Sequence, residues 1–299
     1  MKRSPALAMI AVVGAGDALA HGSDLHAAGM GWTFDPWIVL PLSLAGASYA
    51  IGVARLWHRV GLGHGVTLPQ AGAYALGWLS LAAALVSPLH EWGEHLFTAH
   101  MIEHEIVIAV AAPLLVLARP AAGLLWAFPA SLRHAIGRAM RQPWARRCFE
   151  VLTRPSHATV LHGLALWIWH VPLLFDAAVA DVLLHRLQHL SFILTGVMFW
   201  WAVLRRCDAG LAVWHLFVTM MHMTILGALI ALSPRVLYSL QTAQAARFGL
   251  TPLEDQQLAG LVMWVPAGTV YAGAALVFAA RWIGRSGRRG EQRDAPRQA

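Results

Sequence analysis

The sequence has few charged residues. Only 12% of its 299 residues are Asp, Glu, Lys or Arg, whereas 58% are hydrophobic, and the mean hydropathy is +0.56. A soluble domain of this length carries about a quarter charged residues. The shortage of charge therefore excludes an ordinary soluble domain. It predicts an all-α fold, namely a polytopic helical membrane protein.

Cysteine is nearly absent as well. The chain has two, Cys148 and Cys207, and they form neither a CxxC nor a CxxxC motif. This excludes a dithiol redox centre. Because both cysteines fall in loops predicted below to be cytoplasmic, a structural disulfide on the outer side is excluded too. A copper site must therefore use imidazole, thioether or carboxylate ligands. Imidazole suits copper and zinc, and thioether favours Cu(I).

The N-terminus has the features of a secretion signal. Lys2 and Arg3 precede a short apolar run, and Ala18-Leu19-Ala20 has the small-x-small form of a signal peptidase site. The run is too short to span a membrane comfortably. We expect residues 1–20 to be a signal peptide, with an uncleaved N-terminal anchor as the alternative.

Residues 21–36 would then form a lead-in on the outer face. Cleavage after Ala20 would leave His21 as the mature N-terminus, with His26 close by in the sequence. A terminal amine beside an imidazole can chelate copper. The alternative is that both histidines are simply polar residues of a loop.

Seven stretches are long and apolar enough to cross a bilayer, by the criterion of about 20 residues. The predicted spans are Trp37–Arg55, Ala71–Leu89, Phe97–Leu117, His157–Val171, Leu184–Leu204, Leu211–Leu232 and Leu258–Trp282. They make residues 37–283 one seven-helix membrane domain, followed by a basic tail over residues 284–299. The pieces Ala121–Phe128 and Pro172–Val182 could be interfacial helices or extensions of their neighbours.

Positive charge gathers in every second loop. Arginines follow the first, third and fifth spans and fill the tail, whereas the intervening loops hold mainly acidic residues. By the positive-inside rule, the basic loops and the C-terminus are cytoplasmic and the N-terminus is outside. The net charge of +7 thus has a topological cause and does not predict nucleic-acid binding.

Two matching pairs of histidines open predicted spans, in His100-Met-Ile-Glu-His104 and His185-Arg-Leu-Gln-His189. The spacing puts both histidines of a pair on one face of a helix, about 6 Å apart along the axis. A coordinating group at the mouth of a membrane helix costs free energy, so it indicates a functional site. The two spans run in the same direction. We therefore expect His100 and His185 at one depth, and His104 and His189 one turn deeper.

Other histidines fall at the same predicted surface. Seven lie at or just inside the outer face: His90, His95, His100, His104, His170, His185 and His189. Interfacial histidines can simply snorkel toward water, but that explanation suits one or two side chains better than seven with a repeated spacing. The pattern predicts a metal or haem site that uses some of them.

Two further residues are candidates. His222 sits in the middle of a span within Met220-Met221-His222-Met223, where a polar group needs an internal partner. It could bind a cofactor, or it could be a core histidine bonded to a backbone carbonyl. Asp255 opens the last span and could orient the imidazoles, or it could cap a helix N-terminus.

Several motifs in order resemble one family. They are the histidine pairs; Pro113-Leu114-Leu115 with Arg119-Pro120; Trp167-Ile168-Trp169-His170-Val171-Pro172; Phe199-Trp200-Trp201; Ser233-Pro234 with Tyr238; and Asp255-Gln256-Gln257-Leu258-Ala259-Gly260 before Met263-Trp264-Val265-Pro266. Together they resemble the seven-span CtaG-type cytochrome c oxidase assembly factors, from about Trp37 to Trp282. This is not the single-span, cysteine-containing copper donor that sometimes shares the name.

The resemblance implies a role in maturing a haem-copper oxidase of the bacterial inner membrane, by holding or delivering copper. Oxidase subunits and other copper chaperones are the implied partners, and no catalytic reaction is implied. The carried-over metal ligands are His100, His104, His170, His185 and His189, with Met101 and Asp255 as further candidates.

Two other functions stay open. Histidines at equal depth on two spans could clamp a haem, which would give a Soret band. A metal transporter would carry coordinating residues into the cytoplasmic half. In this chain only His162 and His222 lie deeper than the outer third of the membrane.

Overall fold

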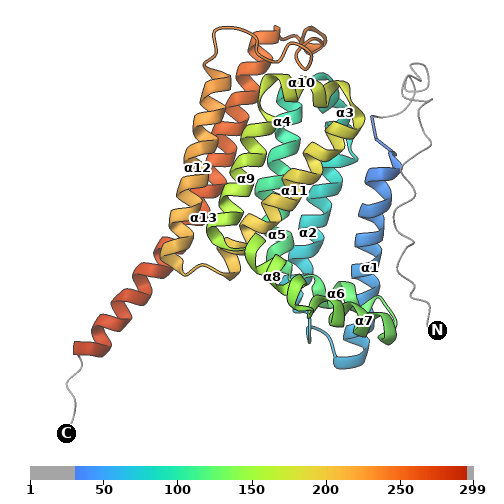
Figure 1. Cartoon of the computed structure of the whole chain (residues 1–299), viewed down its shortest axis with the longest axis vertical. Helices are drawn as coiled ribbons and strands as arrows, with labels where there is room; N and C mark the ends of the chain where they lie inside the picture. Colours follow the sequence, from blue (N-terminus) through green and yellow to red (C-terminus); the bar gives the residue numbers. More distant parts are fainter. Residues whose placement is uncertain (1–30, 295–299) are drawn as a thin grey trace. The chain divides into compact units, whose positions relative to one another are not determined.

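The computed structural model describes residues 31–294, and the side chains of residues 31–285. The predicted signal peptide, His21 and His26 lie outside the described residues. The described chain forms a bundle of α-helices and contains no β-strand (Figure 1). The prediction of an all-α fold is therefore confirmed.

The helices follow one another closely along the chain. They are α1 (Pro36–Val60), α2 (Leu68–Leu85), α3 (Pro88–His95), α4 (Phe97–Glu105), α5 (Ala112–Ala118), α6 (Ala121–Trp126), α7 (Ala130–Met140), α8 (Pro143–Leu152), α9 (Pro155–Trp169), α10 (Pro172–Ala180), α11 (Val182–Arg205), α12 (Ala209–Ala231) and α13 (Pro252–Asp294). A π-helical turn, Ile106–Ala111, joins α4 to α5, and a 3₁₀ turn, Ala245–Phe248, precedes α13.

Five of the helical stretches are long and apolar enough to cross a membrane: Pro36–Val60, Phe97–Ala118, Val182–Arg205, Ala209–Ala231 and Pro252–Arg285. Two bent pairs also qualify when each is taken as one span. The α2–α3 pair bends by 43° and the α9–α10 pair by 75°. The described chain thus has up to seven candidate spans. The two short pieces flagged in the sequence are helices as well, namely α6 and α10.

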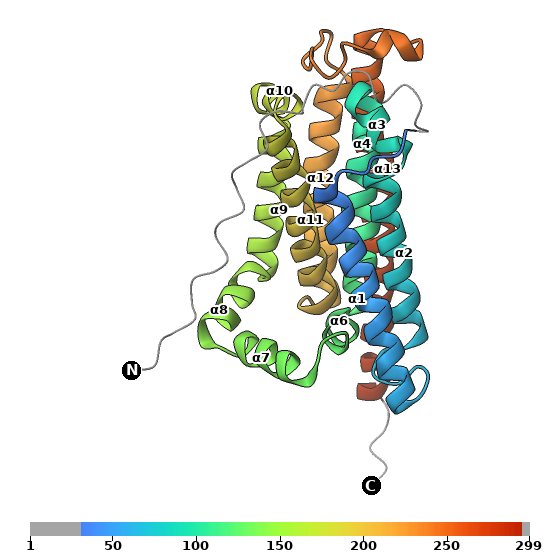
Figure 2. The ribbon, with the colours of Figure 1, turned by 90° about the vertical axis from the view of Figure 1, so that its right-hand side faces the viewer.

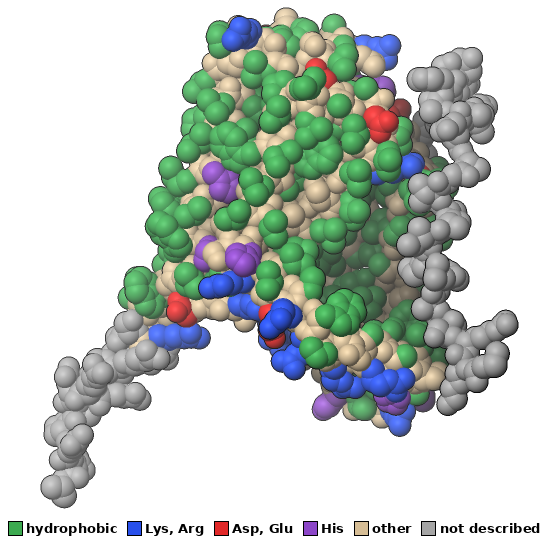
Figure 3. All heavy atoms as spheres, in the orientation of Figure 1, with side chains coloured by type: hydrophobic (Ala, Val, Ile, Leu, Met, Phe, Trp, Pro, Cys, Tyr) green, Lys and Arg blue, Asp and Glu red, His purple; other side chains and the backbone are tan. Residues whose placement is uncertain are grey.

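The arginine-rich loops meet at one end of the bundle. Arg205 donates to the Val116 carbonyl (3.0 Å) and Arg206 donates to the Glu150 carbonyl (3.3 Å), while Arg55 donates to a carbonyl just after α6. Figure 3 shows most of the visible Lys and Arg side chains along this edge. We call it the arginine end. The opposite end, where α3 and α10 lie, is the histidine end.

Helices α12 and α13 pack unusually closely at a pair of glycines. A Cβ atom added to Gly227 would lie 2.9 Å from the Gly260 carbonyl oxygen, and one added to Gly260 would lie 2.5 Å from the Ala231 nitrogen. Small residues at such crossings let two membrane helices approach backbone to backbone, which favours dispersion contacts. This packing fixes the start of α13, which in turn supports the histidine end.

Candidate metal centre

Histidines of α4 and α11 face one another at the histidine end. The ring centroids of His104 and His189 are 4.8 Å apart, and those of His100 and His185 are 5.5 Å apart. Each pair lies on one face of its helix because its members are four residues apart. The structure thus brings together the four histidines that the sequence pairs. Their role as metal ligands stays a prediction.

Three of these side chains form a compact donor set. His100, His104 and His189 each offer one ligand atom, and the three atoms all lie within 4.8 Å of one another. His100 and His104 are buried, and His189 is partly buried. Metal–imidazole bonds are about 2.0–2.1 Å long, so small side-chain adjustments bring the three nitrogens onto one ion.

His185 adds a fourth imidazole beside this set. Its Nε2 atom lies 2.8 Å from Nε2 of His189, and the two rings are stacked with centroids 4.7 Å apart. Both side chains come from the first turns of α11, which begins after the cap formed by Asp181. His185 therefore lies beside the set, in contact with His189 and 5.5 Å from the His100 ring.

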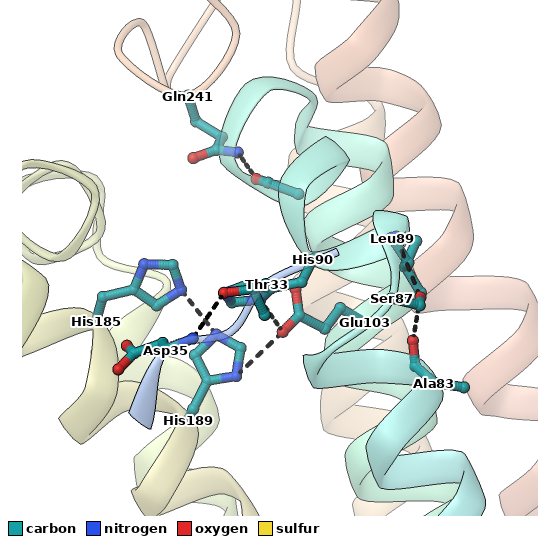
Figure 4. Close-up of polar contacts among 11 residues, drawn as sticks. Thr33, Asp35, Ala83, Ser87, Leu89, His90, Glu103, His185, His189 and Gln241 are labelled. Carbon is teal, nitrogen blue, oxygen red and sulfur yellow. Dashed lines mark hydrogen bonds and ion pairs between the residues drawn. The ribbon is translucent and has the colours of Figure 1, made fainter. Parts of the chain in front are cut away.

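Glu103 is the residue that sequence reasoning missed. Its side chain is buried, and its Oε1 atom lies 2.9 Å from Nδ1 of His90 on α3 and 3.6 Å from Nδ1 of His189 (Figure 4). A buried carboxylate needs a partner of opposite charge or a metal ion. The sequence did contain a signal for Glu103, because an acidic residue inside a predicted membrane span indicates a functional site by itself.

His170 lies at the bend between α9 and α10, and its ring packs beside Phe175 and Phe192, the rings that also contact His100 and His104. Its Nδ1 donates to the Leu166 carbonyl at 2.7 Å, so the lone pair is on Nε2, which is buried without a partner. Metal-bound histidines commonly donate their second nitrogen to a carbonyl in this way. His170 is therefore a further candidate ligand.

A tyrosine from the loop before α13 holds this bend. The Tyr238 hydroxyl donates to the His170 carbonyl at 2.7 Å. Burial, and then the nearby Asp176 carboxylate, raise the pKa of Tyr238, so the phenol stays protonated and keeps donating. The loop thereby contributes to the position of His170.

The imidazoles gathered at the histidine end are those of His90, His100, His104, His170, His185 and His189, which we call the cluster. In and around it, many buried polar atoms have no hydrogen-bond partner in the described chain. They are His95 Nδ1, His100 Nε2, His104 Nδ1 and Nε2, Glu103 Oε2, His170 Nε2, Gln188 Nε2 and His189 Nδ1. Native proteins have only a few such atoms per hundred residues. Most of these are imidazole nitrogens or carboxylate oxygens, which are the donor atoms of copper and zinc sites. A bound cation would satisfy several of them at once.

Asp255 holds α4 in place and does not touch the imidazoles. Its carboxylate accepts hydrogen bonds from the backbone nitrogens of Phe97 (2.8 Å) and Thr98 (2.9 Å), and from the Thr98 hydroxyl (2.8 Å). The residue before α4 provides no side-chain cap, so α13 supplies one. The two predicted roles were to orient the imidazoles or to cap a helix N-terminus. Asp255 is observed as a cap, but it caps α4 and not its own helix, α13.

Met101 and His222 lie apart from the donor set. Met101 is buried in the hydrophobic core among the apolar side chains of α4, α9, α11, α12 and α13. His222 packs on α9, where a Cβ on Gly163 would lie 3.4 Å from its Nε2 atom. Both of its ring nitrogens are buried without a described partner, so the alternative of a bond to a backbone carbonyl is not observed.

A short extended segment before α1 crosses the half-buried side of the cluster. The Thr33 nitrogen donates to the Val86 carbonyl at 3.0 Å, and Arg186 donates to Asp35 at 2.8 Å. The Arg186 guanidinium also lies 5.5 Å from the centre of the Trp37 ring. This segment, residues 32–35, ties the break between α2 and α3 to the first turn of α11. We call it the strap.

These features define the class as a polytopic helical membrane protein with buried imidazoles gathered at one end of its bundle. Residues 47–285 match the family described as cytochrome c oxidase caa3 assembly factor (Caa3_CtaG), and the chain belongs to this family. The match includes every histidine of the cluster and excludes the strap.

Two curated proteins of uncharacterised function are similar to the chain, one from Mycobacterium bovis and one from Mycobacterium tuberculosis. Each is 27% identical over 253 residues, which covers 78% of this chain and 36% of the relative. The chain thus spans about a third of the length of these relatives. No solved structure matches it significantly.

Proposed function

We propose that this protein holds copper at the histidine end and passes it to a haem-copper cytochrome c oxidase during assembly. The observation that carries the proposal is the donor set of His100, His104 and His189, whose ligand atoms lie within 4.8 Å of one another. Glu103 supplies negative charge beside it, and His170 and His185 are further donors. Membership of the assembly-factor family supports the oxidase as the recipient.

The copper is cargo, and the residues act by binding and releasing it. Imidazole and carboxylate donors bind copper without a thiolate, which suits a chain whose two cysteines lie outside the cluster. Release to an oxidase subunit requires that the site be reachable. The partly buried rings of His185 and His189 are the reachable side, beneath the strap. This function needs no catalytic step.

The proposed location is a bacterial inner membrane, with the arginine end in the cytoplasm and the histidine end outside. The gathering of the arginine-rich loops at one end supports this orientation through the positive-inside rule. The histidines would then lie on the side where a copper centre exposed to the outer compartment is loaded. Oxidase subunits and other copper chaperones are the proposed partners.

A haem clamped between facing histidines fits this geometry poorly. The ring centroids within the cluster are 4.2–6.2 Å apart, mostly edge to face, and Phe192 packs against His104 at 4.8 Å. A porphyrin needs a flat slot between its two axial rings. The spacing leaves room for an ion and not for a macrocycle.

A transport path across the bundle is also poorly supported. The deeper His162 has partners for both ring nitrogens, with Thr195 Oγ1 at 3.2 Å and the Tyr271 hydroxyl at 3.4 Å. It therefore offers no open donor to a passing cation. His222 alone does not make a second coordination site, which favours holding over transport.

The test is a deletion strain grown in copper-limited medium. The proposal predicts low activity of a copper-containing oxidase while the oxidase polypeptides are still made, with partial rescue by added copper through mass action. Wild-type protein should restore activity, and the His104→Ala variant should not. Full oxidase activity in the copper-limited deletion strain would refute the proposal.

A further inference from the structure

We propose that α7 and α8 lie in the membrane surface and bind the headgroups of anionic phospholipids. The two helices join α5 to α9 across the arginine end of the bundle (Figure 2). Both α5 and α9 belong to candidate spans. The ends of membrane spans lie at the depth of the lipid headgroups, and short connections tie α7 and α8 to two such ends.

Both helices have an apolar face that no other part of the described chain covers. Neither contributes a single buried residue. On α7 the apolar face carries Leu132 and Met140, and on α8 it carries Trp144, which is 71% exposed, together with Val151. Apolar side chains at helical spacing form one stripe on each helix. Such a stripe on a helix in the membrane plane is buried about 5–10 Å into the headgroup boundary.

Arginines lie opposite these stripes and along their edges. Residues 119–154 contain seven arginines, one glutamate and no lysine. The glutamate, Glu150, pairs with Arg146 at 3.7 Å, and Arg133 lies 4.2 Å from the centre of the Trp126 ring. In the described chain no ion pair involves Arg138, Arg141 or Arg147, which leaves three guanidinium groups for an external anion. A phosphate binds a guanidinium with two parallel hydrogen bonds.

The pattern of arginine and apolar residues within α7 and α8 indicates lipid binding, because membrane topology alone does not explain it. The positive-inside rule requires arginine in this segment but sets no pattern within it. Here each helix has one apolar stripe. Arg138, Arg141 and Arg146 lie opposite the stripes, and Arg133 and Arg147 lie at their edges, as in amphipathic helices that bind membranes. A nucleic acid or a soluble acidic protein would leave the apolar faces uncovered. A bilayer with anionic headgroups covers both faces at once.

Cys148 provides a native reporter, because it is exposed and lies on the apolar side of α8 between Trp144 and Val151. A spin label is attached to it in the Cys207→Ser full chain, reconstituted in vesicles of phosphatidylcholine mixed with phosphatidylglycerol. The matched control is the variant with Glu150→Cys, Cys148→Ser and Cys207→Ser, which carries the label on the opposite, polar face, because positions two apart point to nearly opposite sides of a helix. Oxygen should relax the Cys148 label more strongly than a water-soluble nickel chelate does, and the control label should show the reverse.

Lipid preference is measured on the same protein by native mass spectrometry of retained phospholipid. Wild-type protein should retain phosphatidylglycerol over phosphatidylcholine. Replacing Arg138, Arg141, Arg146 and Arg147 with Gln should lower this preference at least about tenfold. The control is Arg235→Gln with Arg247→Gln, which removes two arginines near the histidine end and should leave the preference unchanged.

Three results would overturn the proposal. Equal nickel accessibility of the two labels would place α8 in water. A Cys148 label shielded from both oxygen and nickel would show that a protein surface covers the apolar face. A phosphatidylglycerol preference that survives the four substitutions would mean that anionic lipid binds elsewhere. Exposed polar substitutions of this kind rarely unfold a protein, and helical content measured by circular dichroism checks this directly.

Discussion

His185 and His189 face each other through their Nε2 atoms, which lie 2.8 Å apart. Two imidazole nitrogens bound to one ion by bonds of about 2.0–2.1 Å lie about 2.8–3.4 Å apart, for square-planar to tetrahedral angles. The pair thus already has the spacing of two ligands of one ion. Without an ion, the N–H group of one ring must donate a hydrogen bond to the other ring.

The position of the two histidines predicts that His189 contributes more to copper affinity than His185 does. His189 belongs to the compact donor set and also contacts His185 and Glu103. His185 lies beside the set, with its ring 5.5 Å from the His100 ring. The His189→Gln variant should lose copper affinity at least about tenfold more than His185→Gln does. Competition titration with a copper chelator measures both constants. Equal losses, or a larger loss for His185→Gln, would contradict this arrangement.

Glu103 should matter through its charge. The Glu103→Gln variant keeps the shape of the side chain but removes the negative charge beside His90 and His189. Copper affinity should fall about 10- to 100-fold, the range found when groups that orient or neutralise a metal site are removed. The matched control is Glu94→Gln, an exposed residue of α3, which should leave the affinity unchanged. The same titration decides.

Asp255 should matter through stability. Its carboxylate caps the two backbone nitrogens that open α4, and truncation leaves buried donors unpaired. Asp255→Ala should lower the free energy of unfolding by about 2–4 kcal/mol, and Asp255→Asn by less. Denaturant unfolding in detergent measures this. The neighbouring Glu254 is the control, because it is exposed and bonds only to Thr251 at the start of its own helix. Glu254→Ala should cost clearly less than Asp255→Ala. Similar losses at both positions would contradict the proposed cap.

The strap should slow the exchange of bound copper. Arg186→Gln breaks the ion pair with Asp35 and should speed chelator-driven release about two- to fivefold, because a partly exposed pair of this kind contributes up to about 1 kcal/mol. Exchanging the two residues, with Asp35→Arg and Arg186→Asp, should restore the slow rate. Stopped-flow release kinetics provide the measurement, and an unchanged rate in Arg186→Gln would show that the strap does not control access.

Much of the fold is readable from the sequence because membrane spans have a strong signal. Long apolar stretches predicted the spans, and alternating basic loops predicted their direction. His100 and His104 lie on one face of their helix however the helices of the bundle pack. The spacing of His185 and His189 gave the matching face on α11. Equal depth of the two pairs follows once both spans run in the same direction. That α4 and α11 are neighbours with their histidines facing each other comes from the packing of the bundle, as the structure shows.

The rest depends on contacts between residues far apart in the chain. Asp255 bonds to Phe97 across 158 residues, and no local spacing links the two. The contact between His90 and Glu103 depends on the 43° bend between α2 and α3. The π-helical turn after Glu105 has no signal in its apolar sequence. His222 was placed correctly within a span, but its neighbour on α9 could not be inferred without the packing.

The most direct test of the copper-holding site is the metal content of the purified full chain. Wild-type protein and the His104→Ala variant are extracted in mild detergent, supplied with copper, passed through gel filtration and analysed for copper per chain, with His134→Ala at the arginine end as the control. The proposed site predicts retained copper in the wild type and the control, and its loss in His104→Ala while the protein stays folded. Copper retained equally by all three proteins, or by none of them, would contradict it.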